Sequence, residues 1–128
     1  MNSSHGVQSE NVSGCLIVRL TGPDFITQKE ATFKTVANAV RAKPIKALLV
    51  DLRGVEGTFS FMDRYQIGEL TGRHLASVPI GALCLQEQLD RQRIAKLVAI
   101  NRGADVEVFI DEAAAYAWLE KHQNARPS

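Results

Sequence analysis

The chain has 128 residues, of which 45% are apolar and 23% are charged, and its net charge is +1. This length and composition are typical of one ordinary globular domain with a hydrophobic core of its own. A nearly neutral charge disfavours a nucleic-acid partner, because such binding depends on clustered lysines and arginines. The same neutrality removes a barrier to self-association, so the sequence leaves a homodimer open.

The sequence predicts neither a membrane protein nor a metalloprotein. No apolar run approaches the roughly 20 residues that cross a bilayer, so we expect no stable membrane insertion. Residues 1–10 lack the basic and apolar regions of a signal peptide, which predicts a cytoplasmic location. Cys15 and Cys84 each lie in an apolar segment and are expected to be buried, reduced thiols. Neither has further ligands at metal-site spacing, so we predict no metal and no cofactor.

The chain predicts five strands and four helices. A weak strand at residues 7–12 and a second at 15–20 are joined by Ser13-Gly14, a hairpin turn signal. Further strands are expected at residues 46–52, 80–85 and 106–110, and helices from residue 27 to Pro44, from 60 to about 76, from 87 or 90 to 101, and from 111 to 122. Residues 1–6 are expected to be a disordered leader and residues 123–128 a frayed tail, which leaves residues 7–122 as the domain.

Three of the helices carry start signals in the sequence. Thr27 and Glu30 have the spacing of a capping box, in which each side chain satisfies a free backbone N–H of the other residue. Ser60 and Asp63 repeat this pattern for the second helix, and Asp111 is expected to cap the fourth. The third helix is expected to bury one stripe, composed of Ile94, Leu97, Val98 and Asn101. The run Arg91-Gln92-Arg93, with Lys96 and Arg102, is the only basic concentration in the sequence and is expected on a solvated face. The alternative is weak contact with an anion or a lipid headgroup.

The segment Ala47–Gly54 indicates the fold class most clearly. It is apolar on both alternating faces and then stops at charged residues and glycine, which is typical of a strand buried from both sides. Helices between successive apolar strands imply right-handed parallel crossovers, and the opening hairpin adds an antiparallel strand at one edge. We therefore predict an α/β fold: a single mixed, mostly parallel sheet of four or five strands flanked by four helices. The carboxyl end of the central strand is where such a sheet presents a site.

Four segments together resemble the SpoIIAA-like branch of the STAS superfamily, the sulfate transporter and anti-sigma-factor antagonist domains that are grouped with SEC14-like proteins. These segments are residues 50–55, 61–70, 101–103 and 108–113, the last of which runs into Trp118-Leu119. The likeness covers about residues 7–120 and depends on the order of the segments rather than on one sharp motif.

The resemblance implies a binding module rather than an enzyme. Anti-sigma-factor antagonists of this family change partners when a serine at the start of the second helix, directly after an aspartate, is phosphorylated. Asp51-Leu52-Arg53-Gly54-Val55 and Phe61-Met62-Asp63 are similar to the family's pattern, but Arg64 stands where the serine is expected. A guanidinium cannot accept a phosphoryl group as a hydroxyl does, so the family's phosphoswitch is not expected here.

The strongest site candidate is the loop at residues 53–65 with the start of the second helix. A helix N-terminus attracts anions, and aromatic and arginine side chains are common interface anchors. The predicted partner-binding residues are Arg53, Phe59, Asp63, Arg64 and Tyr65, with Glu56 beside them. In the alternative interpretation, Phe59 or Phe61 packs as a hydrophobic staple and the charges are merely solvated. We assign no catalytic residue.

We therefore predict a non-enzymatic binding or regulatory module whose partner is another protein or a second copy of the chain. Arg64 and Tyr65 would contact the partner, and loop aromatics would become buried on docking. One alternative is a carrier of a small apolar ligand or lipid, which requires an apolar pocket of roughly 300 Å³ between helices and sheet. Another is a small hydrolase or transferase, which requires Asp51 or Asp63 within hydrogen-bond reach of His74. In the structural alternative to a catalytic role, Asp51 accepts hydrogen bonds from backbone amides of the neighbouring loop, and His74 is a packed, hydrogen-bonded imidazole.

Overall fold

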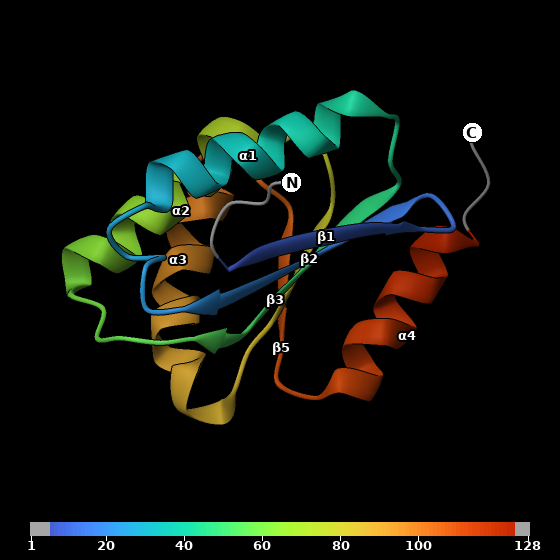
Figure 1. Cartoon of the computed structure of the whole chain (residues 1–128). Coiled ribbons are helices and arrows are strands. Elements are labelled where there is room, and N and C mark those ends of the chain that lie inside the picture. The colour runs from blue at the N-terminus through green and yellow to red at the C-terminus, as the bar shows by residue number, and fades with distance from the viewer. Residues whose placement is uncertain (1–5, 125–128) are drawn as a thin grey trace.

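A five-stranded mixed sheet forms the middle layer of the protein, and its strands follow one another in space as in the sequence (Figure 1). The computed structural model describes residues 6–124. The strands are β1 (Val7–Val12), β2 (Cys15–Gly22), β3 (Ala47–Val55), β4 (Ile80–Leu83) and β5 (Val106–Phe109). β1 is antiparallel to β2, and the other three neighbouring pairs are parallel. The predicted α/β class and mostly parallel sheet are confirmed.

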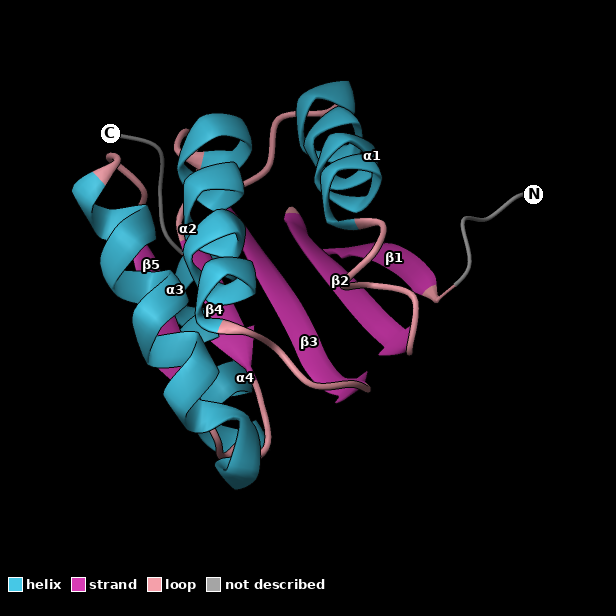
Figure 2. Ribbon diagram, turned by 90° about the vertical axis from the view of Figure 1, so that its left-hand side faces the viewer, coloured by secondary structure: helices cyan, strands magenta, loops and turns pink. Residues whose placement is uncertain are grey.

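Helices cover both faces of the sheet, but unequally. The helices are α1 (Lys29–Ala42), α2 (Phe61–Leu75), α3 (Leu89–Asn101) and α4 (Glu112–Gln123), with a short 3-10 helix, η1 (Gln86–Gln88), before α3. The first three pack against one face with the larger hydrophobic core, and α4 packs alone on the other face over a smaller core. Figure 2 shows α2 and α3 side by side and α1 above β2.

The β1–β2 hairpin forms as the sequence predicts. Ser13 and Gly14 both have positive φ angles, 51° and 86°, which is the conformation that a two-residue hairpin turn requires. Strand alternation then divides β2 between the two cores, because neighbouring side chains point to opposite faces. Leu16 and Val18 join the larger core, and Cys15 joins the smaller one. Cys15 and Cys84 are buried free thiols, as predicted.

The start of α1 differs from the prediction. The helix begins at Lys29 after Gln28, and no side chain caps it. The Thr27 hydroxyl instead donates a hydrogen bond of 3.1 Å to the Asp24 carbonyl, inside the preceding turn. The capping-box spacing is therefore present without its function, because Thr27 lies one residue too early to be the cap. The buried face of α1 includes Phe33 and Val36.

The buried face of α3 also differs from the prediction. Its buried side chains are Gln92, Ala95 and Ala99, whereas Leu97 is 63% exposed. The physical reason is a close approach of α2: a Cβ built on Gly68 would lie 2.6 Å from both the Ala95 carbonyl oxygen and Val98 Cβ. The glycine lets α2 lie directly against Ala95 and Val98 of α3, while Leu97 faces solvent.

Both ends of the described chain are held by hydrogen bonds. The Thr21 amide donates to the Gly6 carbonyl, and the Lys46 ammonium donates to the Gln123 carbonyl at 2.6 Å. The Gln123 side chain donates in turn to Val12. Gly6 and Gln123 thus belong to the folded unit rather than to the leader and tail predicted for them. Residues 1–5 and 125–128 of that leader and tail lie outside the described residues.

Candidate functional site

The start of α2 is built by a complete capping box. The Ser60 hydroxyl accepts from the Asp63 amide at 3.0 Å, and the Asp63 carboxylate accepts from the Ser60 amide at 2.8 Å. Lys29 also reaches the Asp63 carboxylate, at 3.3 Å. The hydrogen bond from the Ser60 backbone, assisted by Lys29, lowers the pKa of Asp63. The predicted cap is confirmed, and Asp63, a predicted contact residue, holds the helix start in place.

Phe59 lies inside the core rather than on the surface. It is 5% exposed, and its ring stacks on Phe25 with 6.1 Å between the ring centroids. Its other face is covered by the guanidinium of Arg91, whose central carbon lies 4.0 Å from the Phe59 centroid. The expectation that this loop aromatic becomes buried on docking is therefore wrong, because Phe59 is already buried in the unbound chain.

The exposed apolar side chains of this segment are the next two residues of the chain. Phe61 is 63% exposed and Met62 is 57% exposed, and both belong to the first turn of α2. From the sequence, Phe61 is predicted only as an alternative hydrophobic staple. A signal was available, because Phe61 and Met62 occupy the first two helical positions after Ser60, while the core-facing repeat of α2 begins later, at Ile67.

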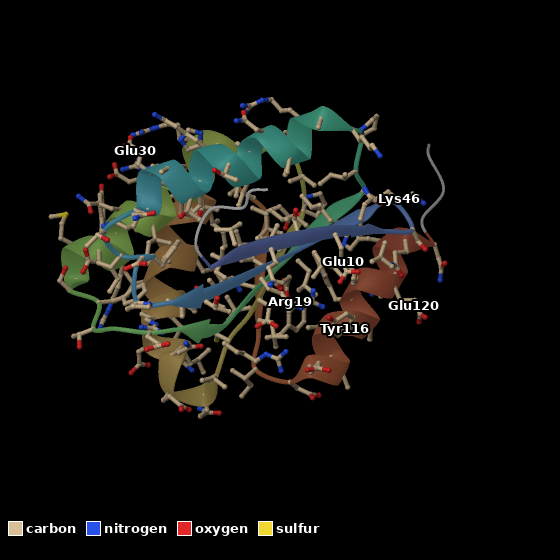
Figure 3. All side chains as sticks on the ribbon, viewed as in Figure 1. Glu10, Arg19, Glu30, Lys46, Tyr116 and Glu120 are labelled. Atoms are coloured by element: carbon tan, nitrogen blue, oxygen red, sulfur yellow. The ribbon has the colours of Figure 1, made fainter. Side chains whose placement is uncertain are left out.

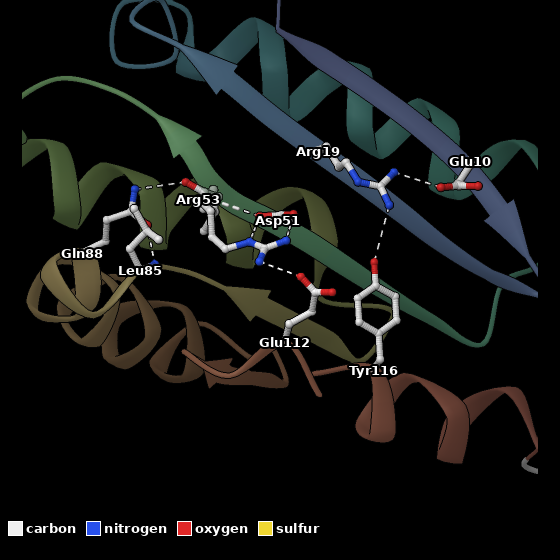
Figure 4. A network of polar contacts seen from close by, with 9 residues as sticks. Glu10, Arg19, Asp51, Arg53, Leu85, Gln88, Glu112 and Tyr116 are labelled. Atoms are coloured by element: carbon white, nitrogen blue, oxygen red, sulfur yellow. Dashed lines mark hydrogen bonds and ion pairs between the residues drawn. The ribbon is translucent and has the colours of Figure 1, made fainter. Parts of the chain in front are cut away.

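Arg53 lies on the opposite side of the sheet, where it forms a polar network with α4 (Figure 4). Its guanidinium donates to both carboxylate oxygens of Asp51, at 3.0 and 2.8 Å, and to Glu112 at 2.7 Å. Burial alone would raise the pKa of Asp51, but the hydrogen bonds and charge of Arg53 outweigh it and lower this pKa. Both carboxylates in turn raise the pKa of Arg53. Asp51 also accepts the Arg53 amide, as expected of a loop-binding carboxylate.

The network is extended on the same face by a second arginine (Figures 3 and 4). Arg19 of β2 donates to Glu10 of β1 at 2.9 Å and to the Tyr116 hydroxyl of α4 at 3.5 Å. Each arginine on this face is therefore paired with a carboxylate. We interpret this group as the contact that fastens α4 to the sheet, since every charged side chain in it already has a partner of opposite charge.

The sequence-predicted site is thus divided by the sheet. Arg53 points to the α4 face, whereas Phe59, Asp63, Arg64 and Tyr65 lie on the side of the three helices. Glu56 is exposed in the loop between them. The two groups are close in sequence, but the strand and the loop turn their side chains to different surfaces. The structure therefore does not bring together the five residues that the sequence placed in one site.

Tyr65 and Arg102 tie α2 to the end of α3. Arg102 donates to the Tyr65 hydroxyl at 2.8 Å and to the Glu69 carboxylate at 2.9 Å. The α3 residues expected on a solvated face are therefore not all solvated. Gln92 is 8% exposed and Arg91 covers Phe59, while Arg93 keeps a side chain that is 68% exposed.

The cavity between sheet and helices is too small for the ligand-carrier alternative. Its volume is about 70 Å³, well below the roughly 300 Å³ that this alternative requires. Apolar side chains line most of it, among them Leu20, Phe33, Val50 and Ile67. A second hollow of about 290 Å³ lies between α1 and α2, but its lining is largely polar and charged and includes Lys29, Glu30, Glu69 and Arg73. Neither is an apolar pocket of the required size.

The arrangement needed by the hydrolase alternative is not formed. His74 lies eleven residues beyond Asp63 on the same helix, which corresponds to about 16 Å. Asp51 is held by Arg53 on the other face of the sheet. The His74 Nε2 atom is buried and has no hydrogen-bond partner within residues 6–124. No cluster of three metal-ligating side chains occurs in that part of the chain either.

None of the described helices has both the length and the apolar character that a membrane crossing demands. No family model matches the sequence, and no curated protein matches it. The structure, by contrast, is similar to a solved anti-sigma factor antagonist from Mycobacterium paratuberculosis. The TM-score is 0.62 at 17% sequence identity, and the match covers 89% of this chain and 92% of that one. The chain therefore has the fold of an anti-sigma factor antagonist, the STAS fold that its sequence motifs predict.

Proposed function

We propose that this chain is a non-enzymatic regulatory module that binds a protein partner through the first turns of α2. The observation that carries the proposal is the pair Phe61 and Met62, which expose 63% and 57% of their surface side by side. Exposed adjacent apolar side chains at the surface of a helix are typical of an interaction surface. Their presentation is fixed by the Ser60–Asp63 capping box directly beneath them.

The fold supports a binding role. The structural neighbour is described as an anti-sigma factor antagonist, a protein that acts on another protein. In this chain, position 64 is an arginine, so regulation by phosphorylation of a serine at that position is not part of the proposal. Arg64 and Tyr65 remain proposed contact residues because they follow Phe61 and Met62 on the same helix. We further propose a cytoplasmic setting, for which two free thiols are typical.

The partner is either a different protein or a second copy of this chain, and one pair of variants tests both. We expect F61S/M62S to keep the stability of the natural chain, because both side chains are already exposed, and to lose at least tenfold in affinity. Leu97→Ser is the matched control, since Leu97 is also 63% exposed but belongs to a different helix, α3.

Two measurements complete the test. Sedimentation velocity of the purified chain reports self-association, and affinity capture from a lysate of the source cells reports other partners. The proposal requires that complexes seen with the natural chain and with L97S disappear with F61S/M62S. Complexes that survive F61S/M62S unchanged would show that partners bind elsewhere on the chain.

A further inference from the structure

Arg64 and Arg91 occupy matching positions on two neighbouring parallel helices. Gly68 of α2 packs on Ala95 and Val98 of α3, and Gly72 packs on Arg102. Both contacts advance toward the carboxyl ends together, so the helices run in the same direction, side by side (Figure 2). One turn before Gly68 lies Arg64, and one turn before Ala95 lies Arg91. The register therefore brings two guanidinium groups to the same end of the helix pair.

Neither arginine has a carboxylate partner within residues 6–124, although all fourteen acidic residues of the chain lie in that range. Nearby carboxylates form ion pairs with other arginines. These pairs are Arg73–Glu30, Arg93–Asp90 and Arg102–Glu69. The Arg91 side chain donates to the Gly57 carbonyl at 3.2 Å, while the Arg64 side chain donates no hydrogen bond to any described residue. The Nε atoms of both are buried and have no hydrogen-bond partner within residues 6–124. Two positive charges are thus left uncompensated in a half-buried place.

This arrangement is costly to the folded chain on its own. Like charges at short range repel, and burial weakens the solvation that would offset the repulsion. Burial lowers the pKa of Arg91, and the charge of Arg64 lowers it further. Both residues also lie in the first turns of their helices, where the helix dipole disfavours cations. Unfavourable charge repulsion of this kind indicates a functional position when a bound ligand can neutralise the charges.

We propose that Arg64 and Arg91 form a receptor for one phosphate group. A phosphate monoester carries about −1.5 to −2 charges at neutral pH, which matches two guanidinium groups. A carboxylate carries one charge and would leave one arginine uncompensated. Guanidinium groups also bind phosphate oxygens through paired hydrogen bonds. The N-terminus of α3 has no side-chain cap and adds a positive dipole at the same place.

The proposal rests on the proposed function only for the source of the phosphate. Phe61 and Met62 precede Arg64 on α2, so a phosphorylated side chain of a docked protein would place its phosphate here. A free phosphate compound would satisfy the same two arginines. Binding of the group itself needs no partner and is measurable with small molecules.

The test is a titration of the full chain with inorganic phosphate, O-phosphoserine and acetate, each at matched ionic strength with chloride. The ¹H–¹⁵N spectrum reports the arginine Nε–H groups and the amides at the starts of α2 and α3. We expect saturable shifts with inorganic phosphate, and at least tenfold weaker binding of acetate. Tighter binding of O-phosphoserine would assign the phosphate to a modified side chain, and equal binding would assign it to a free phosphate compound.

Matched variants locate the receptor. R64Q and R91Q are expected to weaken phosphate binding at least tenfold, while R73Q on α2 and R93Q on α3 bind it as the natural chain does. R91Q also loses contacts to Phe59 and Gly57 and is expected to be less stable, so R64Q carries the test if R91Q does not fold.

Three results would overturn the receptor: no saturation with phosphate, acetate binding as tightly as phosphate, or R64Q binding phosphate like the natural chain. If phosphate binding fails while F61S/M62S still loses its complexes, the receptor is wrong and the proposed function stands. If phosphate binds but F61S/M62S keeps its complexes, the receptor stands and the proposed function is wrong.

Discussion

Arg91 covers the ring of Phe59, with its guanidinium carbon 4.0 Å from the ring centroid. A charged side chain at the surface therefore shields a buried aromatic ring from solvent. Phe59 also stacks on Phe25 beneath. The contact joins the loop after β3 to the first turn of α3. It explains why the loop at residues 53–65 is held against the core at its centre, while its continuation at Phe61 is exposed.

Removing the Phe59 ring should therefore destabilise the fold. We expect Phe59→Ala to lower the free energy of unfolding by about 3–5 kcal/mol, because removing a buried ring loses its hydrophobic transfer free energy and creates a cavity in the core. Phe61→Ala, two residues along, should change it by less than about 0.5 kcal/mol. Urea denaturation followed by Trp118 fluorescence measures both. Equal effects of the two changes would contradict the burial difference.

The helix starts offer a second comparison. Ser60→Ala removes the capping hydroxyl of α2 and should cost about 1 kcal/mol. Thr27→Ala has the same chemistry at the start of α1 but removes only an exposed hydrogen bond to Asp24, so it should cost clearly less. Thermal unfolding by circular dichroism distinguishes them. If Thr27→Ala proved as destabilising as Ser60→Ala, the result would show that Thr27 does cap α1, contrary to the structure.

The crossing of α2 and α3 depends on the missing side chain of Gly68. An added methyl group would lie 2.6 Å from both the Ala95 carbonyl oxygen and Val98 Cβ, so the helices would have to move apart. We expect Gly68→Ala to destabilise the chain by about 1–3 kcal/mol, although alanine favours an isolated helix. Gln66→Ala, at an exposed position of α2, is the control and should be nearly neutral. A Gly68→Ala variant more stable than the natural chain would disprove the close crossing.

The Asp51–Arg53 pair predicts a pH dependence of stability. The pKa of Asp51 is lower in the folded chain than its usual 3.8, so the ionised carboxylate stabilises the fold above about pH 4. This stabilisation is lost as the pH falls through the lower pKa that Asp51 has in the folded chain. Asp51→Asn should therefore be less stable than the natural chain at pH 7, with a smaller loss between about pH 5 and pH 2. Urea unfolding at several pH values measures this.

Glu112→Gln provides the matched control for this pair. Glu112 contacts the same arginine from a side chain that is 59% exposed, so it should affect stability much less than Asp51. Identical pH profiles for Asp51→Asn and the natural chain would show that Asp51 does not carry the effect.

Local features were predictable from the sequence because they depend on neighbours within a few residues. The Ser13-Gly14 turn, the Ser60–Asp63 capping box and the Asp111 cap of α4 all form. The exception at Thr27 is also local: the turn at Asp24 competes for its hydroxyl, and the helix begins later. The two-sided apolar character of β3 correctly placed it inside the sheet, between β2 and β4.

The candidate site was less predictable, because proximity along the chain does not decide which surface a side chain reaches. Arg53 and Arg64 are eleven residues apart, but the sheet separates them, and Arg53 is paired with Asp51 and Glu112. Arg91 was expected in solvent. No spacing rule could place it beside Arg64, since the parallel register of α2 and α3 is set by the contacts of Gly68 and Gly72.

By itself, the sequence determined the elements, their order and the mixed sheet, because hydrophobic periodicity, turns and caps act over short stretches of chain. Only the tertiary structure decided which face of α3 is buried, which aromatic is exposed and which arginines lack a carboxylate. These outcomes depend on how closely two helices approach and on the charges that folding brings near, and both are set by residues distant in the chain.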